Sequence, residues 1–107
     1  MTGTAHELNE AERERIAYLA EECGEVVQAC MKILRHGWNA TDYPDGPASV
    51  VHYDNRENLI EELRNVRKAY ERMKLEGDLG KENPFRSVKK RKLTNQYFHH
   101  QPDYSKT

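Results

Sequence analysis

Two pairs of oxygen-bearing side chains at helical spacing are the residues of this sequence best suited to chemistry. Glu22 and Glu25 are three residues apart, and so are Glu62 and Asn65. Side chains at i and i+3 are neighbours on the surface of a helix. Carboxylate and amide oxygens are ligands that Mg²⁺ accepts in proteins. If the helices that carry them pack antiparallel, the two pairs face each other, and the sequence predicts a divalent-metal site between them.

Two positive side chains follow the first pair. Lys32 lies on the same helical stripe as Glu22 and Glu25, and Arg35 lies a little around the helix. Both can donate hydrogen bonds to phosphate oxygens. A pair of glutamates on a helix is most often only a solvated surface. The hypothesis of a metal and phosphate site therefore depends on the two pairs and the cations together.

The first pair lies on a predicted helix that runs from about residue 9 to His36. Asn9 and Glu12 have the spacing of a capping box, and Gly37 is a plausible C-cap. Gly24 weakens the helix interior, which predicts close packing against another backbone. Apolar residues recur at intervals of three and four, as expected for one buried face: Ile16, Leu19, Ala20, Cys23, Val26, Val27, Cys30 and Leu34.

A second helix is predicted from about Asp54, with Glu57 as its capping partner, to the glycines at 77 and 80. Its apolar face comprises Leu59, Leu63, Val66, Tyr70 and Met73. A third helix is predicted from residue 85 to about residue 98. Residues 1–8 and 99–107 are expected to be loose tails.

The segment 37–54 between the first two helices contains Pro44, Gly46 and Pro47, which exclude a continuous helix. So long a connection in a small domain is typical of a functional or a disordered segment. It also carries Trp38, Tyr43 and Tyr53. These rings either stack on a flat ligand or pack over the end of the helical core, and both possibilities remain open.

Composition sets the fold class. The chain has 107 residues, enough for one domain spanning 1–107, of which 33% are charged and 36% hydrophobic. Such a chain has a thin core, so we expect an all-α helical bundle completed by oligomerisation, as a dimer or tetramer. We expect no signal peptide and no membrane-spanning segment, because no apolar run is long enough to cross a membrane. Cys23 and Cys30 are about 10 Å apart on one helix, beyond disulfide reach, which favours small buried thiols in a reducing cytoplasm.

Three short segments carry a family resemblance. Glu21-Glu22-Cys23-Gly24-Glu25 matches an EExxE motif. Residues 32–37 read K-I-L-R-H-G, similar to K-x-L-R-x-G, and residues 61–66 read E-E-L-R-N-V, similar to E-E-L-G-D-V. Over roughly residues 15–75 the sequence resembles the MazG-like, all-α nucleoside triphosphate pyrophosphohydrolases.

The resemblance implies a helical dimer or tetramer that uses Mg²⁺, with Mn²⁺ also possible. It implies cleavage of a (deoxy)nucleoside triphosphate between the α and β phosphates, with dGTP or dATP among the candidate substrates. Its implied metal ligands are Glu22, Glu25, Glu62 and Asn65. Its implied catalytic residues are Glu21, Glu22 and Glu25. The substrate-binding candidates are Lys32, Arg35 and Trp38, with Lys89 and Lys92 as weaker candidates that reach a neighbouring subunit's site.

One position departs from the family pattern, because Asn65 stands where the motif ends in Asp. An amide oxygen can ligate Mg²⁺, but it brings no negative charge and cannot act as a base. Three interpretations of Asn65 are open. In the first, the enzyme works with the remaining carboxylates. In the second, the change to Asn leaves the fold intact and traps bound substrate, and in the third the protein is a degenerate member that binds nucleotides without turnover. We favour the first interpretation.

Two other functions compete. Lys89-Lys90-Arg91-Lys92 with the aromatic residues and histidines at 97–100 would suit a nucleic-acid-binding module. The net charge of −1 and the shortness of this cluster argue against nucleic acid as a partner. A plain oligomerising helical protein is the third possibility, but it leaves the facing acid pairs unexplained.

Overall fold

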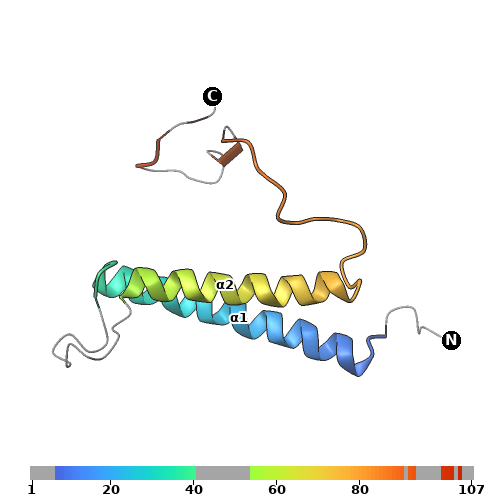
Figure 1. Cartoon of the computed structure of the whole chain (residues 1–107). Coiled ribbons are helices and arrows are strands. Elements are labelled where there is room, and N and C mark those ends of the chain that lie inside the picture. The colour runs from blue at the N-terminus through green and yellow to red at the C-terminus, as the bar shows by residue number, and fades with distance from the viewer. Residues whose placement is uncertain (1–6, 41–53, 91, 94–99, 103, 105–107) are drawn as a thin grey trace.

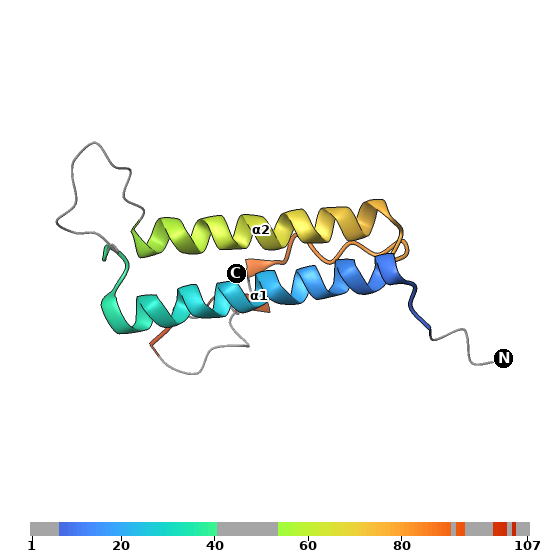
Figure 2. The same ribbon diagram turned by 90° about the horizontal axis from the view of Figure 1, so that it is seen from below.

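Two long antiparallel helices form the body of the protein. The computed structural model describes residues 7–40, 54–90, 92–93, 100–102 and 104. Helix α1 spans Glu10–His36 and helix α2 spans Asn55–Leu75, and the two lie side by side (Figures 1 and 2). The described residues form no strand, so the predicted all-α class is confirmed. Neither described helix has the length and apolar character needed to cross a membrane.

The ends of α1 are fixed by the residues that the sequence suggested. The Asn9 side chain accepts a hydrogen bond from the Glu12 N–H at 2.8 Å, and the Glu12 carboxylate accepts one from the Asn9 N–H at 2.9 Å. This capping box satisfies two N–H groups that the helix itself leaves unpaired. At the other end, Gly37 adopts φ = 84°, and its N–H donates to the Ile33 carbonyl at 2.7 Å. Both predicted caps of α1 are confirmed.

A buried asparagine joins the end of α1 to the start of α2. Asp54 caps α2 by accepting the Glu57 N–H at 2.8 Å. The next residue, Asn55, is 7% exposed, and its side-chain amide donates to the Gly37 carbonyl at 3.0 Å. Its backbone N–H donates to the Ala40 carbonyl. These bonds hold the first turn of α2 beside the last turn of α1, which fixes the antiparallel pairing.

Few apolar side chains are buried between the two helices, and half of them are alanines. The buried apolar residues are Ala29, Ala69, Tyr70 and Met73. The predicted apolar stripe of α1 does not face α2 as a whole, because Ile16, Val27 and Leu34 are 42%, 60% and 77% exposed. The helix is rotated so that Glu22 is buried instead. The expectation that this apolar face of α1 is buried is therefore wrong for Ile16, Val27 and Leu34.

Two further expectations about α1 need correction. Cys23 and Cys30 are free thiols, as predicted, but Cys23 is exposed and Cys30 only half-buried. A Cβ added at Gly24 would meet nothing within 4 Å, so the described part of the chain does not pack against this glycine. Both departures follow from the rotation of α1, which turns this side of the helix away from α2.

The third helix is not formed over the described residues between 85 and 93. Instead, the chain after α2 returns to the helix through Asn83, whose side-chain oxygen accepts from the Tyr70 hydroxyl at 2.9 Å and from the Phe85 N–H at 3.0 Å. The Phe85 and Tyr70 rings lie 4.4 Å apart. Val88 and Leu93 remain exposed. A short helix without a surface to cover gains too little to form.

An ion pair ties the far end of the hairpin together. The Arg15 guanidinium on α1 binds the Asp78 carboxylate after α2 through two contacts, at 2.6 and 2.8 Å. The two side chains are only 19% and 10% exposed. The hydrogen bond from Arg15 lowers the pKa of Asp78 below its ordinary value, although burial acts the other way. This bidentate contact links residues that are distant in sequence and closes the open end of the hairpin.

We expect Asp78→Asn to lower the melting temperature at pH 7, because it removes the charge that Arg15 binds. A depressed carboxyl pKa contributes stability above the ordinary Asp pKa of about 3.9, and that contribution is lost as the pH falls through the folded-state value. The melting temperatures of variant and parent should therefore converge on acidification. Glu71→Gln, which breaks the exposed Arg67–Glu71 pair, is the control and should change little. Equal melting temperatures of parent and Asp78→Asn at pH 7 would contradict this role.

Candidate metal centre

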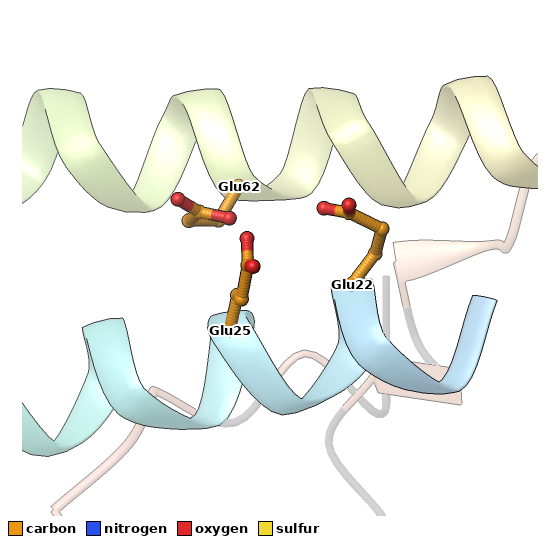
Figure 3. A group of neighbouring side chains, drawn as sticks. All are labelled: Glu22, Glu25 and Glu62. Atoms are coloured by element: carbon orange, nitrogen blue, oxygen red, sulfur yellow. The ribbon is translucent and has the colours of Figure 1, made fainter. Parts of the chain in front are cut away.

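Three carboxylates meet between the two helices. Glu22 and Glu25 reach toward α2 from successive turns of α1, and Glu62 comes from α2 (Figure 3). One oxygen from each lies within 4.8 Å of the others. The antiparallel pairing set by Asn55 brings Glu62 opposite the pair on α1. The predicted convergence of acids from both helices is therefore confirmed for these three residues.

Two oxygens of this cluster are buried and lack a hydrogen-bond partner. They are Oε2 of Glu22 and Oε2 of Glu62. Glu22 as a whole is only 8% exposed. Burying a carboxylate oxygen without a partner costs free energy, and burying it beside other carboxylates costs more. A cation among the three groups would provide the missing partner for both atoms.

The donor set and its spacing fit a hard divalent cation. Octahedral Mg²⁺ at 2.0–2.1 Å from its ligands places ligand oxygens about 2.9–4.2 Å from one another. The oxygens of Glu22, Glu25 and Glu62 lie within 4.8 Å of one another, so small side-chain rotations would close the set. Oxygen ligands alone favour Mg²⁺ or Mn²⁺ over metals that take sulfur and imidazole. These three residues would hold the metal.

The close approach of the three carboxylates shifts the pKa of Glu25 and of the neighbouring Tyr18. A hydrogen bond with Glu62 and the charge of that residue raise the pKa of Glu25, and burial adds to the rise. A hydrogen bond with Glu22 partly opposes it. The charge of Glu22 also raises the pKa of the Tyr18 phenol, together with burial and the hydrogen bond that the phenol donates to Glu22. Without a cation, Glu25 therefore favours keeping its proton.

A cleft beside the carboxylates contains one of the predicted cations. Its volume is about 320 Å³, and its lining comprises Glu25, Gln28, Ala29, Lys32, Asn58 and Glu62. A second cleft of about 400 Å³ shares Gln28 and Lys32 with it and extends to Arg35. The two clefts adjoin along Gln28 and Lys32, with the carboxylates in the first and with Val27, Met31 and Arg35 in the second; together they are called the groove below. A metal-bound phosphate chain could lie along such a groove, with Lys32 beside it.

The other predicted site residues lie outside the three-carboxylate group. Glu21 is exposed on α1 and follows the helix rotation away from α2. Asn65 is half-buried on α2, one turn after Glu62. Trp38 is 49% exposed, and the Arg56 guanidinium lies 5.2 Å from its ring centroid. Of the described candidates, Glu22, Glu25 and Glu62 form the three-carboxylate group, and Lys32 and Arg35 line the clefts beside it.

The basic residues of the C-terminal segment line a separate cavity. Lys89 and Lys92 border a space of about 670 Å³ together with Arg86, and its remaining lining also comes from residues 82–92. No carboxylate of the metal cluster lines it. Tyr43, Tyr53 and Arg91, and the aromatic and histidine residues 97–99, lie outside the described residues. Their suggested parts in stacking and nucleic-acid contact stay predictions.

Three residues of the site were not among the sequence candidates. They are Tyr18, which donates to Glu22, and Gln28 and Asn58, which line the cleft. Each lies three or four residues from one of the carboxylates. Helical neighbours at these intervals share a face, so the spacing could have identified all three once the carboxylates were chosen.

Comparisons with known proteins found no matching family model, and no curated protein or solved structure with significant similarity to the chain.

We expect Glu25→Gln to raise the melting temperature of the metal-free protein, because it removes one of three crowded negative charges. It should also abolish the stabilisation by Mg²⁺. In the parent, Mg²⁺ at 100 times its Kd should add about 2.7 kcal/mol, or roughly 10 °C in a chain of this size. Thermal unfolding with and without Mg²⁺ measures both effects. Glu61→Gln, an exposed neighbour of Glu62, should keep the full Mg²⁺ response. An equal Mg²⁺ response in Glu25→Gln and the parent would show that Glu25 binds no metal.

Proposed function

We propose that the protein is a Mg²⁺-dependent nucleoside triphosphate pyrophosphohydrolase, which converts a (deoxy)nucleoside triphosphate to the monophosphate and pyrophosphate. The observation that carries this proposal is the cluster of Glu22, Glu25 and Glu62 across two helices, with two buried oxygens that lack a partner. The motif resemblance over residues 15–75 supports the reaction class.

The position of each site residue indicates a role in binding either the metal or the phosphates. Glu22, Glu25 and Glu62 would hold the metal, and Tyr18 would orient Glu22 through its hydrogen bond. Lys32 and Arg35 would bind phosphate oxygens along the groove. Bound Mg²⁺ supplies charge neutralisation on the phosphates and a water of lowered pKa. Catalysis of this kind depends mainly on positioning and charge, both of which a rigid pair of helices can provide.

Asn65 leaves the negative charge of the site to the three glutamates. Compared with an aspartate at this position, a neutral amide one turn from Glu62 reduces the negative charge that repels a triphosphate. It also reduces the attraction for the metal. We therefore propose a working enzyme with three carboxylate ligands rather than four, in which the bound phosphate chain supplies further oxygen ligands.

The activity is tested by incubating the protein with each common ribo- and deoxynucleoside triphosphate and Mg²⁺, and by measuring pyrophosphate release. We expect release with at least one nucleotide, and a loss on the order of 100-fold in Glu62→Gln, since a metal ligand is replaced. Glu61→Gln changes the adjacent, exposed carboxylate in the same way and should retain activity.

Two outcomes would contradict the proposal. Full activity in Glu62→Gln would remove the cluster from the mechanism. No pyrophosphate from any nucleotide, together with salt-sensitive binding of single-stranded DNA, would favour the nucleic-acid-binding alternative through Lys89 and its neighbours.

We expect Asn65→Asp to tighten Mg²⁺ binding by about tenfold, or roughly 1.4 kcal/mol, without lowering turnover. The added carboxylate would lie one turn from Glu62 and strengthen the field at the metal. Calorimetric titration with Mg²⁺ gives the affinity, and pyrophosphate release gives the rate. Clearly weaker metal binding in the variant would show that the amide is suited to its position.

A further inference from the structure

A further cleft lies beyond the carboxylates, toward the start of α1, and we call it the Glu14 cleft. Its volume is about 300 Å³, and its lining comprises Ala11, Glu14, Arg15, Tyr18, Ala69 and Arg72. Tyr18 connects it to the metal cluster, because the phenol that lines the cleft donates a hydrogen bond to Glu22. Ligand pockets in proteins have volumes of about 300–1,000 Å³. The cleft is therefore large enough for a small flat group bound next to the metal.

The Glu14 cleft opens on the same side of the hairpin as the groove. About five full turns of 3.6 residues separate Glu14 from Lys32, so the two side chains lie on one edge of α1. On α2, Arg72 of the Glu14 cleft follows Asn58 of the groove by about four turns, which places both on one edge of that helix. The three carboxylates lie between these positions on both helices. A molecule bound at the metal can therefore extend into the groove at one end and into the Glu14 cleft at the other.

The two ends differ in what they can bind. Lys32 and Arg35 bring positive charge to the groove, which suits phosphate oxygens. Glu14 repels phosphate but accepts hydrogen bonds from neutral N–H groups, and Ala69 beside it is small and 3% exposed. Glu14 is about 12 Å from Glu22 along α1 at 1.5 Å per residue, comparable to the reach of a nucleoside from its α-phosphate. The phosphates of a nucleotide therefore fit the groove, and its base fits the Glu14 cleft.

We propose that the Glu14 cleft binds the base of the substrate and that this base is guanine. The inference rests on the proposed function, because it takes the three carboxylates as the metal site of a nucleoside triphosphate. A carboxylate offers two acceptor oxygens and no donor. Guanine presents two adjacent donors to it, N1–H and the 2-amino group. Adenine and cytosine place their amino group beside an acceptor nitrogen, and uracil and thymine place one N–H between two carbonyls, so only guanine matches both oxygens of Glu14.

The other polar residues of the cleft complement the opposite edge of guanine. Arg72 comes from α2, and its exposed ion pair with Glu76 is long, at 3.9 Å. Such a pair contributes little stability, so the guanidinium can turn to donate to O6 and N7 of guanine, its commonest specific contact with a base. Arg15 is held by its two contacts with Asp78. It therefore adds a fixed positive charge beside the acceptor edge.

Binding of nucleotides that resist cleavage tests this inference apart from catalysis. The probes are the α,β-methylene triphosphates of guanosine, inosine and adenosine, titrated calorimetrically into the full chain with Mg²⁺. Hypoxanthine, the base of inosine, differs from guanine only in lacking the 2-amino group. We expect the parent to bind the guanine analogue about tenfold more tightly than the hypoxanthine analogue, which corresponds to one hydrogen bond to a charged acceptor. The adenine analogue should bind more weakly than the guanine analogue.

Two matched variants assign the preference to Glu14. Glu14→Gln has one acceptor oxygen in place of two, so it should bind the guanine and hypoxanthine analogues about equally. Glu10→Gln removes the same charge from an exposed position one turn earlier, outside the lining of the cleft, and should keep the full preference. A parent that binds both analogues equally, or a Glu14→Gln variant that keeps the preference of the parent, would overturn the proposal. Loss of the preference in Glu10→Gln would do the same.

The pyrophosphate assay separates failure of this inference from failure of the proposed function. Pyrophosphate release by a parent that binds the guanine and hypoxanthine analogues equally would overturn the guanine site alone. A guanine preference that depends on Glu14, without pyrophosphate release, would support the site and contradict the hydrolase. Trp38→Leu tests the far end of α1 and should keep the preference for guanine. Loss of that preference in Trp38→Leu but not in Glu14→Gln would place the base beside Trp38 and overturn the proposed orientation.

Discussion

The convergence of three carboxylates between two helices is the constraint on which the rest of this structure depends, with Glu22 buried, Glu62 half-buried and Glu25 exposed. Glu22, Glu25 and Glu62 have oxygens within 4.8 Å of one another, and two of these residues have a buried oxygen without a hydrogen-bond partner. Such an arrangement opposes folding unless a proton or a cation joins it. The raised pKa of Glu25 reflects this cost. The core around the cluster is small, so the hairpin needs other contacts to hold it.

Those contacts lie at the two ends of the hairpin. Asn55 binds the carbonyl of Gly37 at one end, and Arg15 binds Asp78 at the other. Between them, Ala29 and Ala69 allow the helices to approach closely. Fixing both ends sets the register in the middle, and the register determines whether Glu62 lies opposite Glu25. The site therefore depends on residues that have no part in its chemistry.

The local features were predictable from the sequence, whereas the rotation of the helices was not. Asn9, Glu12 and Gly37 act within a few residues of themselves, so their spacing predicted the ends of α1. The spacing of Glu22, Glu25 and Glu62 predicted the acidic cluster. Which side of α1 faces α2 depends on packing between residues that are distant in sequence. From the sequence, either the apolar stripe or the edge that carries Glu22 and Glu25 could have faced α2. The third helix was expected from local pattern, but Val88 and Leu93 had no surface to cover.

The position of a bound metal tests the three-carboxylate site most directly. Mn²⁺ gives a strong anomalous X-ray signal, and its octahedral oxygen preference resembles that of Mg²⁺. Crystals of the full chain grown with Mn²⁺ should show an anomalous peak among the carboxylates of Glu22, Glu25 and Glu62, at about 2.0–2.3 Å from one oxygen of each. A peak elsewhere with these carboxylates unbound, or full Mn²⁺ occupancy in the Glu25→Gln variant, would contradict it.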